Sequence, residues 1–551
     1  MKIALAQLNY HIGNFESNTK KIVDAIHQAK SQGAEIVLFS ELAVCGYPPR
    51  DFLEFEDFIQ CCENAIDEIK SHTAGIAVLV GCPSRNPKIE GKDLFNSAYF
   101  LADGEIKKII HKTLLPTYDV FDENRYFEPN KSFEIVEYKG KKIAVTICED
   151  LWNLGNSNPL YTICPMDELM KFKPEMILNL SASPFDYEHA EDRKRVLKAN
   201  AQAYNIPIYY CNQVGAQTEI IFDGGSLVIN ASGEVVEELA YFNEELRITN
   251  YELGMHLPNN LITNNSITTS ENHTSKIHDA LVLGIRDYFQ KMNFKKAILG
   301  LSGGIDSALV LYLAAQALGK ENVHSLLLPS EYSTSHSISD AEQLCKNLGT
   351  SYDIVPIKNN YEAFLNTLSP YFKDLPFNVA EENLQARTRG VLLMAFSNKF
   401  GYILLNTTNK SEAAVGYGTL YGDMCGGIAV LGDVYKTQVF ELCKWINQDE
   451  EIIPSNIITK PPSAELRPNQ KDSDSLPEYD VLDKILYQYI EKRQGPKELI
   501  AQGFASDLVN RVLKMVNSNE WKRHQSAPIL RISKKAFGVG RRMPIVGKYL
   551  S

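Results

Sequence analysis

The chain has 551 residues, of which 44% are hydrophobic and 23% are charged. This length exceeds what one hydrophobic core organises and predicts two or three domains of ordinary globular composition. A formal net charge of −12 gives no broad electrostatic attraction to nucleic acid or to anionic membranes, so we expect neither as a partner.

The N-terminus reads as a strand from its first residues, and we expect no signal peptide before it. No apolar run reaches the roughly 18 residues needed to span a bilayer. The ten cysteines are scattered and form no C-x-x-C pair. This usage is typical of reduced thiols and predicts a cytoplasmic protein without a structural zinc site.

The first half of the chain alternates apolar strands with helices, which predicts a sheet covered by helices. We expect helices over 18–30 and 55–70. We expect strands over 2–7, 35–39, 76–80, 96–101, 107–112, 142–148, 176–180, 208–212 and 226–230.

The alternation stops in a stretch rich in Asn, Thr and Ser, which predicts a domain boundary. We therefore divide the chain into a first domain over 1–255, a polar linker over 256–275 and a second domain over 276–551. In the second domain the pattern resumes as a doubly wound α/β fold with a parallel sheet. We expect helices over 277–292, 308–317, 338–348 and 380–397, and strands over 296–301, 323–328, 352–355 and 402–406.

One glycine-rich turn lies where the first strand of the second domain becomes a helix. Two glycines let the backbone approach a ligand closely, and the free N–H groups of the first helical turn favour a phosphate. No Gly-Lys-Ser/Thr follows, so this is not a Walker A loop. The motif Ser-Gly-Gly-x-Asp-Ser resembles the pyrophosphate loop of the ATP pyrophosphatases. The resemblance implies an ATP site formed by Gly300, Leu301, Ser302, Gly303, Gly304, Ile305, Asp306 and Ser307. The stretch 406–412, which resembles the NAD synthetases, adds Thr407 to the expected ATP contacts.

Three reactive side chains in the first domain follow apolar strands: Glu41, Lys112 and Cys148. Ends of strands are where α/β folds collect functional residues. The set suits amide hydrolysis. Cys148 would be the nucleophile, Lys112 would stabilise the thiolate and the oxyanion, and Glu41 would carry the proton. Taken singly, each is more often a surface charge or a packed thiol.

In the order Glu–Lys–Cys and with these flanking sequences, the first domain resembles the nitrilase superfamily. The resemblance implies an α/β/β/α sandwich, the catalytic triad Glu41, Lys112 and Cys148, and Glu123 as a fourth catalytic residue. The flanks resemble the glutaminase branch that is fused to NAD synthetases, which implies glutamine contacts from Tyr118, Ser183 and His189. Related sequences often carry a more basic residue at the position of His189.

Four stretches of the second domain resemble the NAD synthetases: 381–389, 406–412, 460–477 and 534–542. The resemblance implies contacts to deamido-NAD⁺ from Asn383, Glu412 and Lys535. Asp306 and Glu412 offer hard oxygen ligands for Mg²⁺ on ATP. Arg387, Lys436 and Lys535 would compensate the negative charge of the two nucleotides locally.

Together these resemblances imply a glutamine-hydrolysing ligase that amidates deamido-NAD⁺ through an adenylated intermediate. Ammonia would pass from the Cys148 site to the ATP site, and a homo-oligomer is expected. Two alternatives remain open. The second domain could activate another carboxylate or carbonyl acceptor, or the first domain could be a retired amidase used for docking or oligomerisation.

Overall fold

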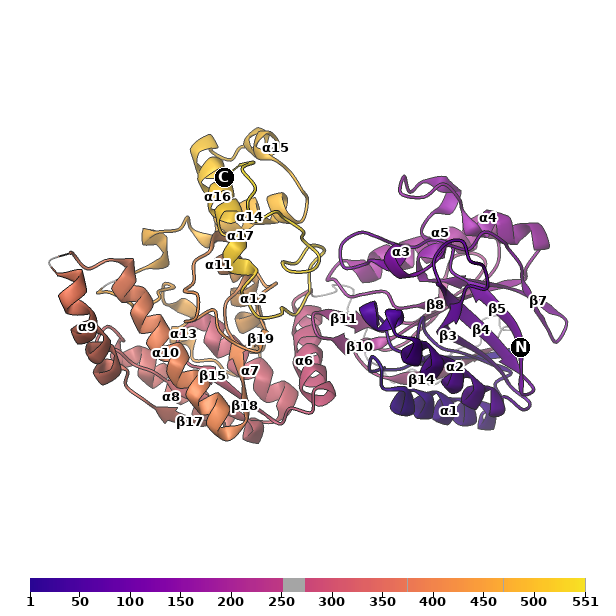
Figure 1. The fold of residues 1–551 in the computed structure, drawn as a ribbon, viewed down its shortest axis with the longest axis horizontal. Coiled ribbons are helices and arrows are strands. Elements are labelled where there is room, and N and C mark those ends of the chain that lie inside the picture. Colours follow the sequence, from indigo (N-terminus) through magenta and orange to yellow (C-terminus); the bar gives the residue numbers. More distant parts are fainter. Residues whose placement is uncertain (251–272, 374, 469, 551) are drawn as a thin grey trace. The chain divides into compact units, whose positions relative to one another are not determined.

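The structure, a computed structural model, describes residues 1–250, 273–373, 375–468 and 470–550. The chain divides into two compact units, Met1–Glu271 (unit 1) and Asn272–Ser551 (unit 2). The predicted linker over 256–275 lies almost entirely outside the described residues. Figure 1 shows the elements of both units, and across the described residues no helix is long and apolar enough to cross a membrane.

Unit 1 contains two six-stranded sheets, ordered β14-β1-β2-β3-β4-β5 and β13-β12-β9-β8-β7-β6. The strands of the first sheet are β1 (Lys2–Gln7), β2 (Ile36–Leu38), β3 (Ala77–Arg85), β4 (Leu94–Ala102), β5 (Glu105–His111) and β14 (Glu245–Asn250). Those of the second are β6 (Val136–Tyr138), β7 (Lys141–Ile147), β8 (Met176–Ser181), β9 (Ile208–Asn212), β12 (Leu227–Ile229) and β13 (Val235–Glu238). A separate hairpin pairs β10 (Val214–Gln217) with β11 (Ile220–Asp223).

The two sheets pack face to face, and helices cover their outer faces. In β1, Ile3 and Leu5 join the core between the sheets, whereas Ala4 and Ala6 face the helices. The first sheet is covered by α1 (Phe15–Ser31) and α2 (Glu56–Ser71), and the second by α4 (Pro165–Leu169) and α5 (His189–Tyr204). The predicted α/β/β/α sandwich is confirmed.

Unit 2 is built on a parallel five-stranded sheet of order β17-β16-β15-β18-β19. Its strands are β15 (Lys296–Gly300), β16 (Val323–Leu327), β17 (Ser351–Ile354), β18 (Tyr402–Asn406) and β19 (Ile428–Ala429). The helices between them are α7 (Ile305–Leu318), α8 (Ser335–Leu348), α9 (Lys358–Phe372), α10 (Val379–Phe400) and α11 (Lys410–Val415). Because β15 pairs with β16 on one side and β18 on the other, the strand order reverses at the end of β15, where doubly wound folds bind nucleotides.

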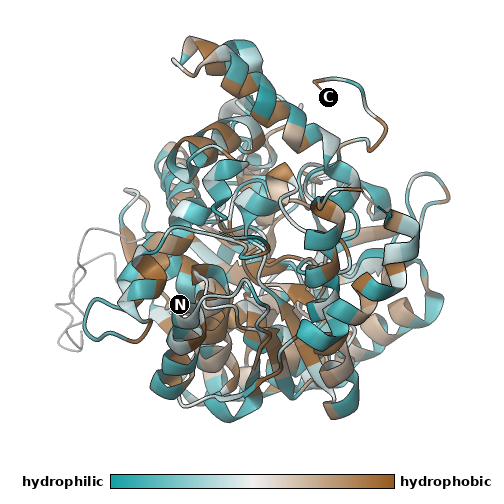
Figure 2. Cartoon of the chain, turned by 90° about the vertical axis from the view of Figure 1, so that its left-hand side faces the viewer, coloured by the Kyte–Doolittle hydropathy of each residue, from teal (hydrophilic) through white to brown (hydrophobic). Residues whose placement is uncertain are grey.

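The remaining helices of unit 2 precede or follow this sheet. They are α6 (His273–Lys291), α12 (Lys436–Ile446), α13 (Ser455–Thr459), α14 (Tyr479–Ile490), α15 (Pro496–Ala501), α16 (Ser506–Ser518) and α17 (Glu520–Arg523). Helices α14, α15 and α16 share a second apolar core with α11. Figure 2 shows the strands mainly in the apolar colour and the outer helices striped with polar residues, as burial on one helical face requires.

Candidate active sites

Glu41 lies in a tightly packed turn after β2. Its side chain is only 1% exposed, and the next residue, Leu42, has φ = +48°. The turn rests directly on the backbone of Gly81 in β3, where an added Cβ would lie 2.3 Å from the Leu42 nitrogen. A residue without a Cβ is therefore required opposite Glu41, and the turn has no room to shift towards β3.

Lys112 follows β5 by one residue and lies between two carboxylates. Its Nζ is 2.6 Å from Glu41 Oε1 and 2.8 Å from Glu123 Oε1, and all three side chains are buried. Burial alone would lower the pKa of Lys112, but Glu123 and Glu41 raise it well above its usual value, which favours the ammonium form. Burial raises the pKa of Glu123 to about 7 despite the lysine.

Cys148 begins a 3-10 turn, η2 (Cys148–Leu151), directly after β7. Its φ of +44° is unusual for a residue with a side chain, and such a conformation costs about 1–3 kcal/mol. Burial raises the pKa of the Cys148 thiol well above its usual value; Glu41 raises it further, while Lys112 opposes the shift. Burial thus favours the neutral thiol form of Cys148.

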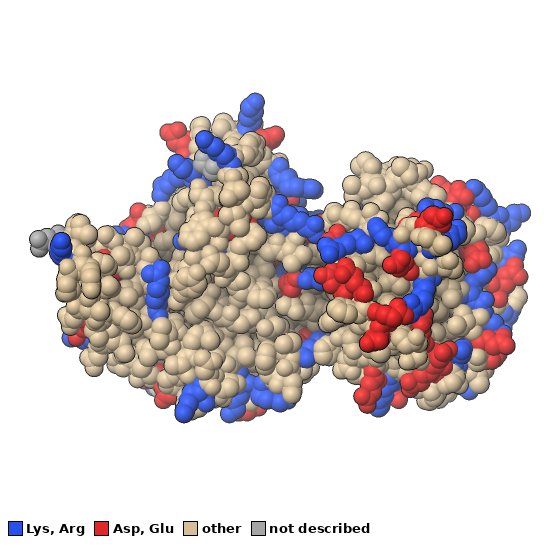
Figure 3. All heavy atoms as spheres, in the orientation of Figure 1, with Lys and Arg blue, Asp and Glu red and all other residues tan. Residues whose placement is uncertain are grey.

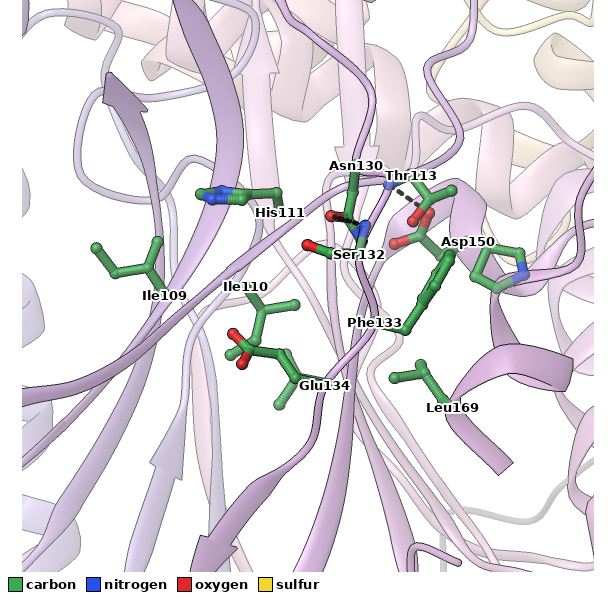
Figure 4. A pocket seen from close by; sticks show the side chains of 12 residues that line it. Ile109, Ile110, His111, Thr113, Asn130, Ser132, Phe133, Glu134, Asp150 and Leu169 are labelled. Atoms are coloured by element: carbon green, nitrogen blue, oxygen red, sulfur yellow. Dashed lines mark hydrogen bonds between the residues drawn. The ribbon is translucent and has the colours of Figure 1, made fainter. Parts of the chain in front are cut away.

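Asp150 fixes the positions of Lys112 and Cys148 relative to each other. Its Oδ1 accepts hydrogen bonds from the amides of Thr113 (3.0 Å) and Leu114 (2.9 Å), and its Oδ2 accepts one from Ile147 (3.0 Å). It also borders a cavity of about 90 Å³ between β5 and the segment 130–134 (Figure 4). Two strand ends are thus held by one carboxylate.

The predicted glutamine contacts lie among polar and aromatic side chains that include residues 149 and 152, which follow Cys148. Tyr118 donates to Glu149 Oε1 at 3.0 Å, and Tyr161 donates to the same oxygen at 2.9 Å. Ser183 Oγ is 2.8 Å from His189 Nε2, whose ring stacks on Trp152 at a centroid distance of 5.3 Å. The three predicted glutamine contacts therefore form two groups: Tyr118 lies beside Glu149, and Ser183 and His189 lie beside Trp152.

Glu149 is a residue that the sequence analysis missed. It is buried, and among the described residues no cationic side chain lies within salt-bridge distance of it. Burial raises its pKa, and the hydroxyls of Tyr161 and Tyr118 oppose that shift. The available signal was a charged residue placed directly after Cys148 at the end of an apolar strand.

In unit 2 the predicted ATP loop spans the junction of β15 and α7. Gly303 has φ = +77°, and an added Cβ would lie 2.2 Å from the carbonyl oxygen of Ser337 in α8. Ser307 Oγ donates to the carbonyl of Gly304 (3.0 Å), and Gly304 N donates to Ser302 Oγ (3.2 Å). The loop is therefore closed on itself by its own two serines.

A charged cluster lies beside this loop. Asp306 accepts hydrogen bonds from Lys436 and, at 2.9 Å, from Asn409 Nδ2. Glu412 caps α11 and lies 3.5 Å from Lys436 Nζ. Burial raises the pKa of Glu412 to about 8, and Asp306 adds to the rise. Two carboxylates thus converge on one lysine.

The other predicted residues of unit 2 lie on separate segments. Asn383 in α10 accepts a hydrogen bond from Thr419 at 2.6 Å, and Thr407 follows β18. The carbonyl of Lys535 accepts from Lys410 Nζ at 3.1 Å. Among the described residues, no hydrogen bond joins Asn383 or Thr407 to the ATP loop.

Lys410, which begins α11, holds the segment of Lys535 in place. It is fully buried and lies 2.8 Å from Asp433 Oδ1 and 3.0 Å from Glu491 Oε1. Asp433 also accepts from the amides of Ile532 (2.8 Å) and Ser533 (2.7 Å). This ion pair links the C-terminal segment to the helix that carries Glu412.

Both units match known families. Residues 2–255 match the model described as carbon-nitrogen hydrolase, and residues 277–526 match that described as NAD synthase. The fold and the sites therefore define a carbon-nitrogen hydrolase domain followed by an NAD synthase domain.

Full-length relatives contain the same two domains in one chain. A glutamine-dependent NAD(+) synthetase of Synechocystis sp. is 48% identical over 549 residues, with 98% of each chain covered. One of Thermotoga maritima is 41% identical over 581 residues, covering 100% of this chain and 99% of its own.

A solved structure agrees with these relatives. The glutamine-dependent NAD+ synthetase of Acinetobacter baumannii, in complex with ADP, is 38% identical and has a TM-score of 0.77, with 100% and 99% of the two chains covered. The chain belongs to the family of glutamine-dependent NAD(+) synthetases. It is accordingly a ligase, in which the first domain hydrolyses glutamine and the second amidates deamido-NAD⁺.

Proposed function

We propose that glutamine is hydrolysed through a thioester on Cys148. Glu41 takes the thiol proton, the sulfur attacks the amide carbon, and Lys112 stabilises the oxyanion. Glu41 returns the proton to the leaving nitrogen, releasing ammonia, and water then cleaves the thioester to give glutamate. The observation that carries this proposal is the placement of Lys112 between Glu41 (2.6 Å) and Glu123 (2.8 Å), beside the buried thiol.

Glu149 would recognise the amino-acid end of glutamine. A buried carboxylate next to the nucleophile, held by two tyrosine hydroxyls, is unfavourable until a cation compensates it. The α-ammonium of glutamine supplies that cation. Ser183 and His189 would contact the α-carboxylate, and Tyr118 would both hold Glu149 and border the substrate.

The second unit would activate the nicotinate carboxylate of deamido-NAD⁺ as an adenylate. That carboxylate attacks the α-phosphate of ATP and expels pyrophosphate, and ammonia then displaces AMP to give NAD⁺. The loop Gly300–Ser307 and Thr407 would bind ATP, and Asn383, Glu412 and Lys535 would bind deamido-NAD⁺. Support comes from the position of the loop at the switch point of the parallel sheet and from the ADP bound by the Acinetobacter baumannii relative.

Mg²⁺ would bind with ATP at Asp306 and Glu412. Across the described residues no group of three or more His, Cys, Asp or Glu side chains forms a metal site by itself. Mg²⁺ in nucleotide sites is nevertheless usually bound by only one or two protein carboxylates, because the phosphates of the nucleotide supply further oxygen ligands. When bound, the ion would neutralise phosphate charge.

Ammonia would pass between the two sites without release, because free ammonia is mostly protonated at neutral pH and then not nucleophilic. We would test this by supplying unlabelled glutamine together with ¹⁵N-ammonium in solution. Unlabelled NAD⁺ is the expected product. Label in the product in proportion to the free ammonium would overturn the protected transfer.

The main test replaces Cys148 by Ala and measures NAD⁺ formation with glutamine and with ammonium salt. Activity with glutamine should disappear, whereas activity with ammonium should remain. Cys164→Ala, which removes another buried thiol of the same unit, is the matched control and should keep both activities. Normal activity of Cys148→Ala with glutamine would overturn the proposed nucleophile.

We also propose that the chain forms a homo-oligomer through unit 2. Large apolar side chains are exposed on α9 and α10, among them Tyr371 (77%), Val379 (63%) and Val391 (61%). The face of this unit seen in Figure 3 carries few charged side chains. Exposed apolar area of this kind marks association surfaces, and light scattering of Val391→Asp against the natural chain would test this one.

A further inference from the structure

The glutaminase site contains two buried carboxylates, Glu41 and Glu123, but only one ammonium. Lys112 donates to one oxygen of each at similar distances, 2.6 and 2.8 Å. The lysine therefore does not by itself decide which carboxylate stays ionised and serves as the base. Another group must distinguish them.

Asn96 in β4 is in a position to make that distinction. Its Nδ2 is 2.7 Å from Glu41 Oε1 and 3.3 Å from Glu123 Oε2. The shorter bond is the stronger one, so Asn96 interacts more strongly with Glu41 than with Glu123. The amide of Ala182 also donates a hydrogen bond to Glu41, to its Oε2 at 3.1 Å, and so adds to the number of donors around this carboxylate. The Tyr47 hydroxyl donates a hydrogen bond to Glu123 at 2.8 Å and therefore reduces the difference between the two carboxylates.

The orientation of the Asn96 amide leaves one of its two polar atoms without a protein partner. Asn96 is 1% exposed, and its Oδ1 has no hydrogen-bond partner among the described residues. Turning the amide over would place this oxygen against two carboxylates, which is worse. The site therefore keeps an unsatisfied buried oxygen in order to direct the NH₂ group at the two acids.

We propose that Asn96 is a positioning residue that assigns the roles of the two carboxylates: its shorter bond holds Glu41 in place as the base and leaves Glu123 as the group that takes up a proton. This inference rests on the proposed role of Glu41. Asn96 itself touches neither the thiol nor the substrate in this scheme. The raised pKa of Glu123, to about 7, agrees with this division.

The test compares the pH profile of glutamine hydrolysis in Asn96→Leu, Asn96→Asp and the natural chain. In Asn96→Leu the ionised form of Glu41 loses a charge-assisted hydrogen bond, so the acid limb of kcat/KM should move up by about one pH unit. Asn96→Asp has the same shape but adds a third carboxylate, and at neutral pH it should be the less active of the two. The pH dependence of Cys148 alkylation by iodoacetamide should shift in parallel.

Asn200 provides the matched control. It is also 1% exposed, and its Oδ1 also lacks a partner among the described residues, but its Nδ2 donates to the neutral carbonyls of Leu151 and Val196, each at 2.9 Å. Asn200→Leu should lower the melting temperature without moving the acid limb. Activity with ammonium should survive in every variant, because it bypasses the glutaminase.

The expected results distinguish a wrong role for Asn96 from a wrong assignment of Glu41 as the base. An unshifted acid limb in Asn96→Leu, or natural activity in Asn96→Asp, overturns the role of Asn96. Glu41→Gln is measured alongside, and if it hydrolyses glutamine normally, then the proposed base is wrong as well. Equal shifts in Asn96→Leu and Asn200→Leu would assign the effect to packing and would likewise overturn the proposal.

Discussion

Replacing Glu149 by Gln removes one negative charge next to Cys148 and keeps the shape of the side chain. If Glu149 binds the α-ammonium of glutamine, the variant loses a hydrogen-bonded charge contact in a buried site. Such contacts contribute about 1.5–3 kcal/mol, which corresponds to a loss of about 10- to 150-fold in kcat/KM. The carboxylate is only 5% exposed, so solvent screening does not reduce this range substantially.

The assay compares ammonia release from glutamine and from glutaramate, which is glutamine without its α-amino group. The natural chain should prefer glutamine, and Glu149→Gln should lose that preference by lowering activity on glutamine alone. Tyr161→Phe removes one hydroxyl donor, 2.9 Å from Glu149, but keeps the charge, so it should retain the preference. An equal loss on both substrates in Glu149→Gln would refute α-ammonium recognition and leave only a general effect on the site.

Three further outcomes follow from the geometry. Gly81→Ala should abolish glutamine-dependent synthesis and spare ammonium-dependent synthesis, because its Cβ would lie 2.3 Å from the Leu42 nitrogen; unchanged glutaminase activity would contradict this packing. Lys410→Met should lower the free energy of unfolding by about 3–5 kcal/mol in denaturant titration, since it leaves Asp433 buried without its 2.8 Å partner. Asp306→Asn should stop NAD⁺ formation with either nitrogen source, while purified protein still hydrolyses glutamine; retained synthesis would remove Asp306 from the ATP site.

The regular elements of both units were largely predictable. Strands 2–7, 208–212 and 402–406 are observed with the expected limits, because short apolar runs between turn residues specify buried strands. Strands 107–112 and 142–148 end one residue earlier than expected. That difference places Lys112 and Cys148 just beyond the sheet, where their side chains leave the alternation of the strand.

Other features had no local signal. The strand β14 and the hairpin β10–β11 are defined by antiparallel pairing with distant or adjacent segments, and their sequences are too mixed in polarity to stand out. Asn96 lies on a predicted strand, but its two acidic partners are 55 and 27 residues away. Contacts of this kind arise from tertiary packing. They cannot be predicted from one sequence, because no periodicity or motif spacing connects residues that are so far apart along the chain.

The single carboxylate of Asp150 has a consequence for hydrogen exchange. Because it accepts from the amides of Thr113, Leu114 and Ile147, these three protons are protected by one group, although they belong to two strand ends. Any opening that releases Asp150 should expose all three together, and any smaller fluctuation should expose none. Their common opening free energy would therefore report how often Asp150 releases the ends of the two strands that precede Lys112 and Cys148.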